Sequence, residues 1–389
     1  MVELANGLCG QQEQLGHDVT VVATNLDGAN LLEVSLDKPV SVGNIDVSYF
    51  PVDGWVNRIP VPMIRRFAVS SRLDGWLREH VSDFDIVHVH AIYLYPSLVA
   101  CAACRRAKIP YVISPYGNLD PVTHLHHRLI KEIYLAAFER RDLNGAAAIH
   151  FMSRGEQSLA KGFATSARTE VINLGLPPEK FVSLPNKGTF RARHPELASK
   201  RLIMYLGRIS YSKGLDLLAT AFGLLAKRHS DAHLLLIGPD YEGYGKLVSR
   251  VLSEQGVEER ATFMGMVTEE EKLSALVDAD VFVLTSYTEG FGLAMLEAMA
   301  CGAPVVLSDQ ASLAPELAAA DAVLTTELRP EAIAEAVERV LSDDAEAERL
   351  TRNGRVLVAK RFTWPALAGK FLDLYQECVA RAEAKAARG

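Results

Sequence analysis

Cysteine, long apolar runs and blocks of basic residues are all scarce in this sequence. Five cysteines among 389 residues are few and odd in number, so the sequence predicts no disulfide framework. No apolar run approaches the roughly 18 residues that a membrane-spanning helix needs, and residues 1–19 lack a basic segment followed by an apolar one. A formal charge of -7 without a basic block argues against nucleic acid as a partner. These absences predict a soluble, cytoplasmic protein.

The sequence also lacks a pattern typical of a metal site. Cys101 and Cys104 form a pair without a second pair or a histidine cluster to complete it, so we interpret them as small residues on a buried helix face. His124, His126 and His127 favour a polar surface over a ligand set. We therefore expect neither a metal ion nor another cofactor.

The sequence does contain a regular alternation of short apolar strands with helical stretches. The expected strands are 19–24, 84–90, 111–114 and 146–152 in the first half, and 201–207, 232–238, 261–265, 280–285 and 303–308 in the second. Near-continuous apolar strands separated by helices are typical of parallel sheets covered on both faces. Prolines and glycines at 173–190 interrupt both periodicities. The sequence thus predicts an α/β fold of two Rossmann-like, doubly wound domains that face each other across a cleft.

Two cations follow one of the expected strands. In the segment GRISYSKG, Gly207 ends the strand at 201–207, and Arg208 and Lys213 follow in the loop. Ligands collect at the carboxyl ends of strands in an open parallel sheet, so these side chains are placed to hold a polyphosphate. From this segment alone, ordinary surface charges are the favoured interpretation.

A second loop changes that balance. Residues 286–309 follow another expected strand and contain Glu289 and Glu297, with Gly290 and Gly292 between them. The glycines let backbone N–H groups approach a ligand, and a helix beginning near Gly292 would point its positive end at an anion. Alternatively, the helix N-terminus favours Glu289, and Glu297 is a solvated helix position. Two strand-loop-helix sites in one domain favour ligand binding.

Together these segments resemble the signature of glycosyltransferase family four, the group 1 retaining enzymes with the GT-B fold. The resemblance rests on the GR and KG pairs at 207–214, on two glutamates separated by seven residues, and on GFGLAMLEAMACGAPVV. Further matches lie at 15–22, 84–90, 263–286 and 361–375. The resemblance implies an acceptor-side domain at 1–175, completed by a C-terminal helix at 362–389, and a donor-binding domain at 176–361.

The resemblance also assigns roles to residues. Arg208 and Lys213 would hold the donor diphosphate. Glu289 would contact the transferred sugar, and Glu297 the ribose. The other donor-binding positions lie in two loops: Gly290, Phe291, Gly292 and Leu293 at the phosphates, and Gly265, Met266 and Val267 beside the base. Fixed cations and a helix N-terminus can stabilise a departing diphosphate without a metal, so catalysis would fall to Glu289, Arg208 and Lys213, with no covalent nucleophile.

The acceptor side is expected to contain His90, Tyr116, Gly117 and Asn118. His90 ends the strand at 84–90, and residues 114–121 resemble a segment that carries a histidine near the reacting sugar in many relatives. This chain has Tyr116 there. Because a phenol ionises about three units above neutral pH, we expect no proton-transfer role for Tyr116.

Family members usually begin with a strand and a glycine-rich loop ahead of a helix that corresponds to residues 2–16. The printed chain starts inside that helix. Either the start of the sequence is misplaced, or the protein lacks its first strand and part of the acceptor-side wall. In the chain as printed, we expect the strands at 19–24 and 84–90 to border an unpaired position.

The leading functional hypothesis is a retaining, hexosyltransferase-type enzyme. It would transfer a sugar from a nucleotide-activated donor to a glycan or lipid-linked acceptor during assembly of a surface polysaccharide or glycoconjugate. The alternatives are a nucleotide-sugar-binding paralogue without turnover and, less favoured, a GT-B epimerase. A helical stretch also carries Arg65, Arg66, Arg72 and Arg78 beside apolar residues. Core packing with a solvated basic face is favoured there, so contact with the inner face of a membrane is expected to be weak and peripheral.

Overall fold

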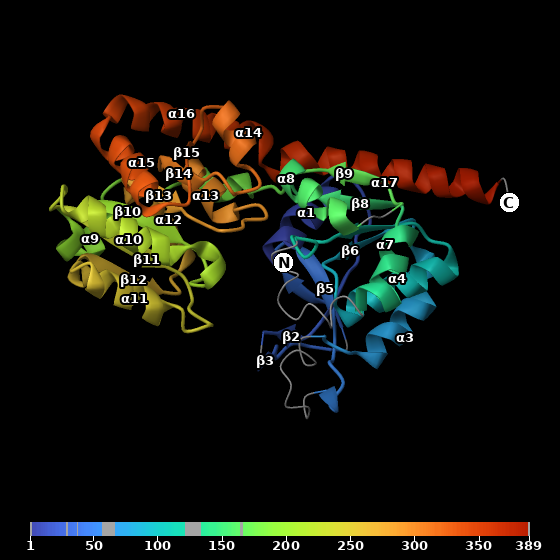
Figure 1. Cartoon of the computed structure of the whole chain (residues 1–389). Coiled ribbons are helices and arrows are strands. Elements are labelled where there is room, and N and C mark those ends of the chain that lie inside the picture. The colour runs from blue at the N-terminus through green and yellow to red at the C-terminus, as the bar shows by residue number, and fades with distance from the viewer. Residues whose placement is uncertain are drawn as a thin grey trace. The chain divides into compact units, whose positions relative to one another are not determined.

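The chain divides into two compact units, which the computed structural model describes over residues 2–28, 30–36, 38–56, 67–120, 134–163 and 166–387 (Figure 1). Unit 1 comprises Met1–Gly175 and Trp364–Gly389, and unit 2 comprises Leu176–Thr363. The sequence placed the two boundaries after residues 175 and 361. The division found in the structure falls after residues 175 and 363.

Unit 2 is built on one six-stranded parallel sheet with the strand order β12-β11-β10-β13-β14-β15. The strands are β10 (Arg201–Leu206), β11 (Ala232–Ile237), β12 (Ala261–Gly265), β13 (Val281–Leu284), β14 (Val305–Ser308) and β15 (Leu324–Thr326). Every residue of β11, β13 and β14 is buried, which explains their unbroken apolar sequences. The sequence predicted five of these strands and missed the short edge strand β15.

Helices follow the strands of unit 2 in regular alternation. They are α9 (Thr189–Arg193), α10 (Leu215–Ala226), α11 (Gly245–Glu254), α12 (Glu269–Asp278), α13 (Leu293–Cys301), α14 (Ala314–Ala319), α15 (Pro330–Ser342) and α16 (Asp344–Arg361). The strand order reverses its direction between β10 and β13, and the loops after these two strands carry the predicted donor-site cations and carboxylate.

The strands of unit 1 form two main sheets. A four-stranded parallel sheet contains β6 (Val87–His90), β7 (Tyr111–Ser114), β8 (Ala148–Phe151) and β9 (Thr169–Val171). A three-stranded sheet has β1 (Val21–Thr24) parallel to β5 (Ile45–Phe50), which pairs antiparallel with β4 (Val40–Val42); β2 (Leu26–Asp27) and β3 (Asn30–Leu31) form a separate short pair. The sequence prediction missed the β4-β5 hairpin and β9.

Helices cover the two main sheets of unit 1. They are α1 (Val2–Gln14), α3 (Ser71–His80), α4 (Tyr95–Ala107), α7 (Arg140–Gly145), α8 (Arg154–Leu159) and α17 (Trp364–Ala386), with short helical turns at Val81–Asp83, Leu135–Glu139 and Ala160–Phe163. The last helix, α17, packs against the first, α1. At Gly7 of α1, an added Cβ would lie only 1.8 Å from the indole nitrogen of Trp364, so only glycine permits this close approach.

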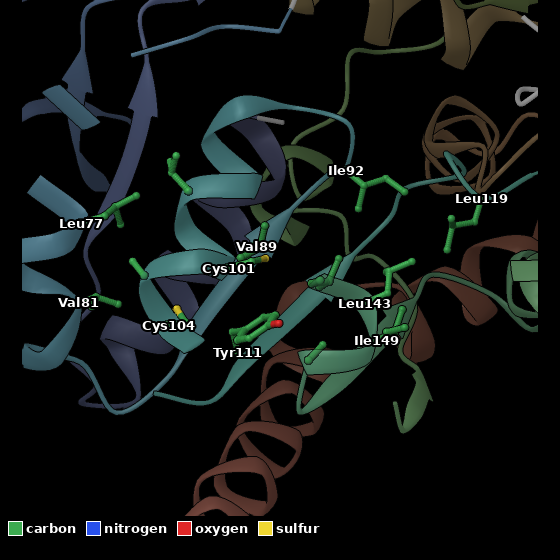
Figure 2. Packing of buried hydrophobic residues seen from close by; sticks show 14 of the residues in the cluster. Leu77, Val81, Val89, Ile92, Cys101, Cys104, Tyr111, Leu119, Leu143 and Ile149 are labelled. Carbon is green, nitrogen blue, oxygen red and sulfur yellow. The ribbon is translucent and has the colours of Figure 1, made fainter. Parts of the chain in front are cut away.

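Figure 2 shows the core between β6, β7, β8 and the helices on one face of the sheet. Cys101 and Cys104 of α4 lie in this core, as predicted, beside Tyr111 and Val89. All five cysteines are buried and free, which agrees with the prediction of no disulfide framework.

A cavity of about 770 Å³ separates the two main sheets of unit 1. Within the described residues, β1 pairs with β5 alone and β6 with β7 alone, and no strand pairing joins β1 to β6. Residues 19–22 and 86–88 line two sides of the cavity. Side chains of α1, α3 and α17 also line it.

The basic helical stretch fits core packing over the residues that the structure describes. Leu73 and Leu77 of α3 are buried, and Arg78 pairs with Asp74 at 2.6 Å. Arg65 and Arg66 lie outside the described residues. None of the helices described combines the length and the apolar composition needed to cross a bilayer.

Candidate functional site

The centre of the candidate donor site is an ion pair between two loops of unit 2. The Lys213 Nζ atom lies 2.7 Å from Glu289 Oε2, and the same oxygen accepts a hydrogen bond from the Ser286 hydroxyl at 3.1 Å. The two charged side chains are only 15% and 13% exposed. The structure therefore brings together a cation and a carboxylate that are 76 residues apart in the chain.

Backbone contacts hold the Lys213 loop in place. Residues Tyr211–Lys213 form a single helical turn that ends at Gly214, whose φ is 60°. A Cβ at Gly214 would lie 2.2 Å from the Thr285 carbonyl oxygen, so the position requires glycine for both its conformation and its contact. The Thr285 hydroxyl donates to the carbonyl of Gly214 at 3.1 Å, and the Tyr287 N–H donates to the carbonyl of Ser212 at 2.9 Å.

Arg208 differs from Lys213 in its surroundings. Its side chain is exposed and forms no ion pair with the described residues, while its carbonyl accepts a hydrogen bond from the Tyr205 hydroxyl at 2.8 Å. An anion could approach Arg208 directly. At Lys213, the same anion would share the ammonium with Glu289.

The helix α13 begins at Leu293, next to Gly292, as the sequence predicted. Gly292 has φ 82° and precedes the first helical residue, so the chain turns sharply at this point. The first N–H groups of a helix have no partner within the helix and carry partial positive charge. Phe291 is buried, with its ring 6.2 Å from that of Phe362, and it anchors the loop to the core of unit 2.

Glu297 on α13 is held by a residue that the sequence analysis missed. The Lys272 Nζ atom on α12 lies 2.7 Å from Glu297 Oε1 and 3.0 Å from Glu269 Oε2. Burial lowers the pKa of Lys272, but the neighbouring carboxylates of Glu297 and Glu269 outweigh it and raise the pKa above its ordinary value. The spacing of Glu269 and Lys272 could have predicted their pairing on one helix, but the contact with α13 is tertiary.

The predicted base-binding loop follows β12. Gly265 ends that strand with φ 65°, Met266 is 73% exposed, and Val267 is partly exposed. An exposed, unbranched apolar side chain can cover a flat ring, so the loop is chemically compatible with a base.

His90 and Tyr116 of unit 1 lie in direct contact. The Tyr116 hydroxyl is 2.6 Å from His90 Nδ1, and the two rings are nearly parallel, with centroids 5.8 Å apart. Burial raises the pKa of the Tyr116 phenol and lowers that of His90 to about 4. The phenol therefore donates and the neutral imidazole accepts, which leaves the His90 proton on Nε2.

Gly117 and Asn118 belong to the turn that follows Tyr116. The Gly117 N–H donates to Glu156 Oε1 at 2.6 Å, and the Asn118 side-chain amide donates to the Pro115 carbonyl at 2.8 Å. These contacts shape the turn at the carboxyl end of β7. The sequence analysis selected Gly117 and Asn118 but missed Glu156.

A hydrogen-bonded chain of buried and part-buried side chains lies next to this cluster. His150 Nε2 donates to the Ile172 carbonyl at 2.6 Å, so the Ser114 hydroxyl donates to His150 Nδ1. Ser114 in turn accepts from His88 Nε2 at 2.7 Å, and the Tyr375 hydroxyl of α17 donates to His88 Nδ1 at 2.6 Å. The direction of every bond follows from the carbonyl at one end.

Within the described ranges, no group of three or more histidine, cysteine, aspartate or glutamate side chains is arranged to hold a metal ion. The predicted surface histidines at 124, 126 and 127 lie outside the described residues. The site residues themselves offer cations, carboxylates and backbone N–H groups.

Comparison with known families matches both halves of the chain. Residues 186–357 match the family described as glycosyl transferases group 1, and residues 1–186 match a glycosyl transferase 4-like domain.

Similar proteins extend over most of the chain. A D-inositol 3-phosphate glycosyltransferase of Corynebacterium urealyticum is 30% identical, over 79% of this chain and 75% of that protein. A GDP-mannose:cellobiosyl-diphosphopolyprenol alpha-mannosyltransferase of Komagataeibacter xylinus is 27% identical over 97% and 89%. Among solved structures, sucrose-phosphate synthase from Thermosynechococcus elongatus has a TM-score of 0.78 at 22% identity. The match covers 96% of this chain and 92% of the synthase chain. That likeness supports the GT-B fold.

Proposed function

Since the chain belongs to the group 1 glycosyl transferases, we propose that it is a retaining, hexosyltransferase-type enzyme that takes its sugar from a nucleotide-activated donor. The observation that carries the proposal is the Lys213–Glu289 ion pair, which lies in the loops after β10 and β13, with α13 beginning four residues beyond Glu289. The loops that follow two adjacent strands thus supply a cation, a carboxylate and a helix N-terminus at the carboxyl end of the sheet.

The leaving group explains why cations belong in such a site. When a nucleoside diphosphate departs, negative charge accumulates on its β-phosphate. Lys213, Arg208 and the first N–H groups of α13 are preorganised donors for that charge. In this proposal they perform the role for which other transferases use a divalent cation, so activity requires no added metal.

Glu289 is proposed to position the sugar. Its carboxylate already accepts hydrogen bonds from Lys213 and Ser286, and both contacts lower its nucleophilicity. A carboxylate held in this way can still favour positive charge at the anomeric carbon. Retention is therefore proposed without a covalent glycosyl-enzyme intermediate.

The acceptor is proposed to be a glycan or a lipid-linked glycan. The name of the Komagataeibacter xylinus relative specifies a diphosphopolyprenol-linked acceptor. We extend this acceptor class to the present chain, and we propose assembly of a surface polysaccharide or glycoconjugate as its setting, with weak peripheral membrane contact where the acceptor is a lipid.

A donor screen by mass spectrometry tests the proposal. Purified protein is incubated with a panel of UDP-, GDP- and ADP-sugars, with and without EDTA, and both hydrolysis and transfer are followed. We expect turnover of one donor class that persists with EDTA and falls in Arg208→Ala. Tight binding without turnover would support the nucleotide-sugar-binding alternative, and an isomerised sugar would indicate an epimerase.

A further inference from the structure

A buried carboxylate joins the carboxyl ends of two neighbouring strands in unit 1. Glu156, in the first turn of α8, is only 3% exposed. Its Oε1 atom accepts the Gly117 N–H at 2.6 Å, and its Oε2 atom accepts the Met152 N–H at 2.7 Å. Gly117 follows β7 and Met152 follows β8, so one side chain fixes both loops.

The Gly117 contact adjoins a strained residue. Tyr116 has φ 53°, a conformation that is strained for a bulky L-residue and persists only where its surroundings enforce it. Two contacts do so here. Glu156 holds the peptide N–H that follows Tyr116, and His90 accepts the Tyr116 hydroxyl at 2.6 Å.

No cation of the described residues compensates the Glu156 charge. Among the residues that the structure describes, none forms an ion pair with this carboxylate, so its burial has a cost that two N–H donors offset only in part. Burial raises the pKa of Glu156 to about 7, although the N–H groups of Gly117 and Met152 oppose the shift. Of the carboxylate and its isosteric amide, only the carboxylate offers an acceptor oxygen to each N–H, which indicates a specific role for the charge.

The same arrangement occurs after the adjacent strand β6. Glu139 is 3% exposed, and its Oε2 atom accepts the N–H of Tyr93, which has φ 62°. Thus a buried carboxylate anchors the loop after β6 and the loop after β7. In the first loop it contacts the strained residue itself, and in the second it contacts the residue that follows the strained one.

We propose that Glu156 is a positioning residue for the His90–Tyr116 cluster: its carboxylate fixes the Tyr116–Gly117 peptide and so holds the Tyr116 phenol on His90. The proposal goes beyond the assignment of a glycosyltransferase, and it rests on the proposed function only where it treats this cluster as the acceptor side.

Protonation of Glu156 would weaken the cluster. In a neutral carboxyl group one oxygen becomes a hydroxyl, which is a much weaker acceptor, so one of the contacts with the Gly117 and Met152 N–H groups weakens. Among the described residues, Tyr116 from the loop after β7 is a titratable side chain that interacts with Glu156, while Arg154 and Lys161 nearby in the sequence are exposed. Because burial lowers the pKa of His90 to about 4, a change at His90 near pH 7 would report on Glu156.

Nitrogen-15 NMR of the full-length protein with labelled histidine tests this inference without any substrate. The His90 Nδ1 resonance is assigned with His90→Gln and followed from pH 5 to pH 9. In the unsubstituted protein we expect one inflection near pH 7, because the Tyr116 hydrogen bond weakens as Glu156 is protonated. In Glu156→Gln the inflection should disappear, and the resonance should move towards its position in Tyr116→Phe.

Glu170→Gln is the matched control, because Glu170 is a partly exposed carboxylate on β9 of the same unit that pairs with Arg168. It should retain the inflection. A His90 resonance that is flat from pH 5 to pH 9 in the unsubstituted protein would overturn the proposal, even if Glu156→Gln failed to fold. An inflection that survives in Glu156→Gln would overturn it as well. Neither result depends on donor turnover, so failure here and failure of the proposed function remain distinguishable.

Discussion

Lys213 and Glu289 are joined by a 2.7 Å ion pair, so the cation and the carboxylate of the candidate donor site hold each other in position. Removing either one leaves a nearly buried charge without its partner. A substitution at either residue therefore affects both catalysis and the stability of the charged partner that remains.

Alanine at Arg208 or Lys213 should lower turnover more than donor affinity. Each cation interacts most strongly as charge accumulates on the departing phosphate, so its loss should cost roughly 2 to 4 kcal/mol of transition-state stabilisation, about a hundredfold in rate. Lys213→Arg should rescue poorly, because a planar guanidinium does not reproduce a compact ammonium beside Glu289. Turnover and donor dissociation constants are measured for each variant.

Lys227→Ala is the control for those cations, because Lys227 is an exposed residue at the far end of α10. Its turnover should match that of the unsubstituted protein. If Arg208→Ala and Lys213→Ala behave as Lys227→Ala does, both cations are ordinary surface charges.

Tyr116→Phe should keep transfer activity within about tenfold. The substitution removes one hydrogen bond, worth about 0.5–1.5 kcal/mol, and preserves the ring that lies against His90. Burial raises the pKa of the phenol, so at neutral pH even less of it is present as the phenolate that could accept a proton. A loss approaching a thousandfold in transfer rate, with donor binding intact, would show that Tyr116 handles a proton.

Gly214→Ala should destabilise unit 2 more than Gly256→Ala does. Both positions have positive φ, 60° and 69°, and so share the strain of about 1 kcal/mol that alanine meets there. A Cβ at Gly214 would also meet the Thr285 carbonyl oxygen at 2.2 Å, whereas nothing lies within 4 Å of one at Gly256. Thermal melting should give a clearly lower midpoint for Gly214→Ala. Equal midpoints would mean that the Gly214 and Thr285 loops can move apart to accept a Cβ without loss of stability.

His150 should make stability sensitive to mild acid. Burial lowers its pKa to about 4, while an unfolded histidine titrates near 6.5, so the unfolded chain binds more protons between these values. The stabilisation from neutral His150 is complete above about pH 6.5 and is lost as the pH falls towards 4, at about 1.4 kcal/mol per pH unit. Glu139 and Glu156, whose pKa values burial raises to about 7, act in the opposite direction, so the effect is best isolated by substitution.

Urea unfolding of His150→Gln and of the unsubstituted protein at several pH values provides that comparison. The difference between their unfolding free energies should shrink as the pH falls from 6.5 to 4. Exposed His17→Gln should show no such trend. A constant difference for His150→Gln would contradict a neutral, buried imidazole.

The donor half was predictable because its signals are local. Strands such as β11 and β13 are apolar at nearly every residue, and glycines mark the turns at Gly214 and Gly292. The β4-β5 hairpin was missed although Ile45, Val47 and Tyr49 alternate on one buried face and Gly43 turns the chain. This antiparallel hairpin alternates more and less buried residues, so it lacks the unbroken apolar runs that mark the buried parallel strands.

Contacts between distant segments could not be predicted in the same way. Lys272 meets Glu297 from another helix, and Glu156 reaches Gly117 from 39 residues away. His88 bonds to Tyr375, which lies 287 residues later in the chain. Local sequence patterns do not predict such pairs, because each contact depends on how whole strands and helices pack against one another.

The cavity between β1 and β6 divides unit 1 into two parts that differ in how they can open. Each sheet keeps its own ladder of hydrogen bonds, and within the described residues no strand pairing crosses the cavity. The β1-β5-β4 sheet can therefore separate by releasing side-chain packing, without breaking any hydrogen bond between the strands of the β6-β9 sheet. Amide hydrogen exchange would then resolve two levels of protection in one compact unit, with lower protection at Val21–Thr24 than at Tyr111–Ser114.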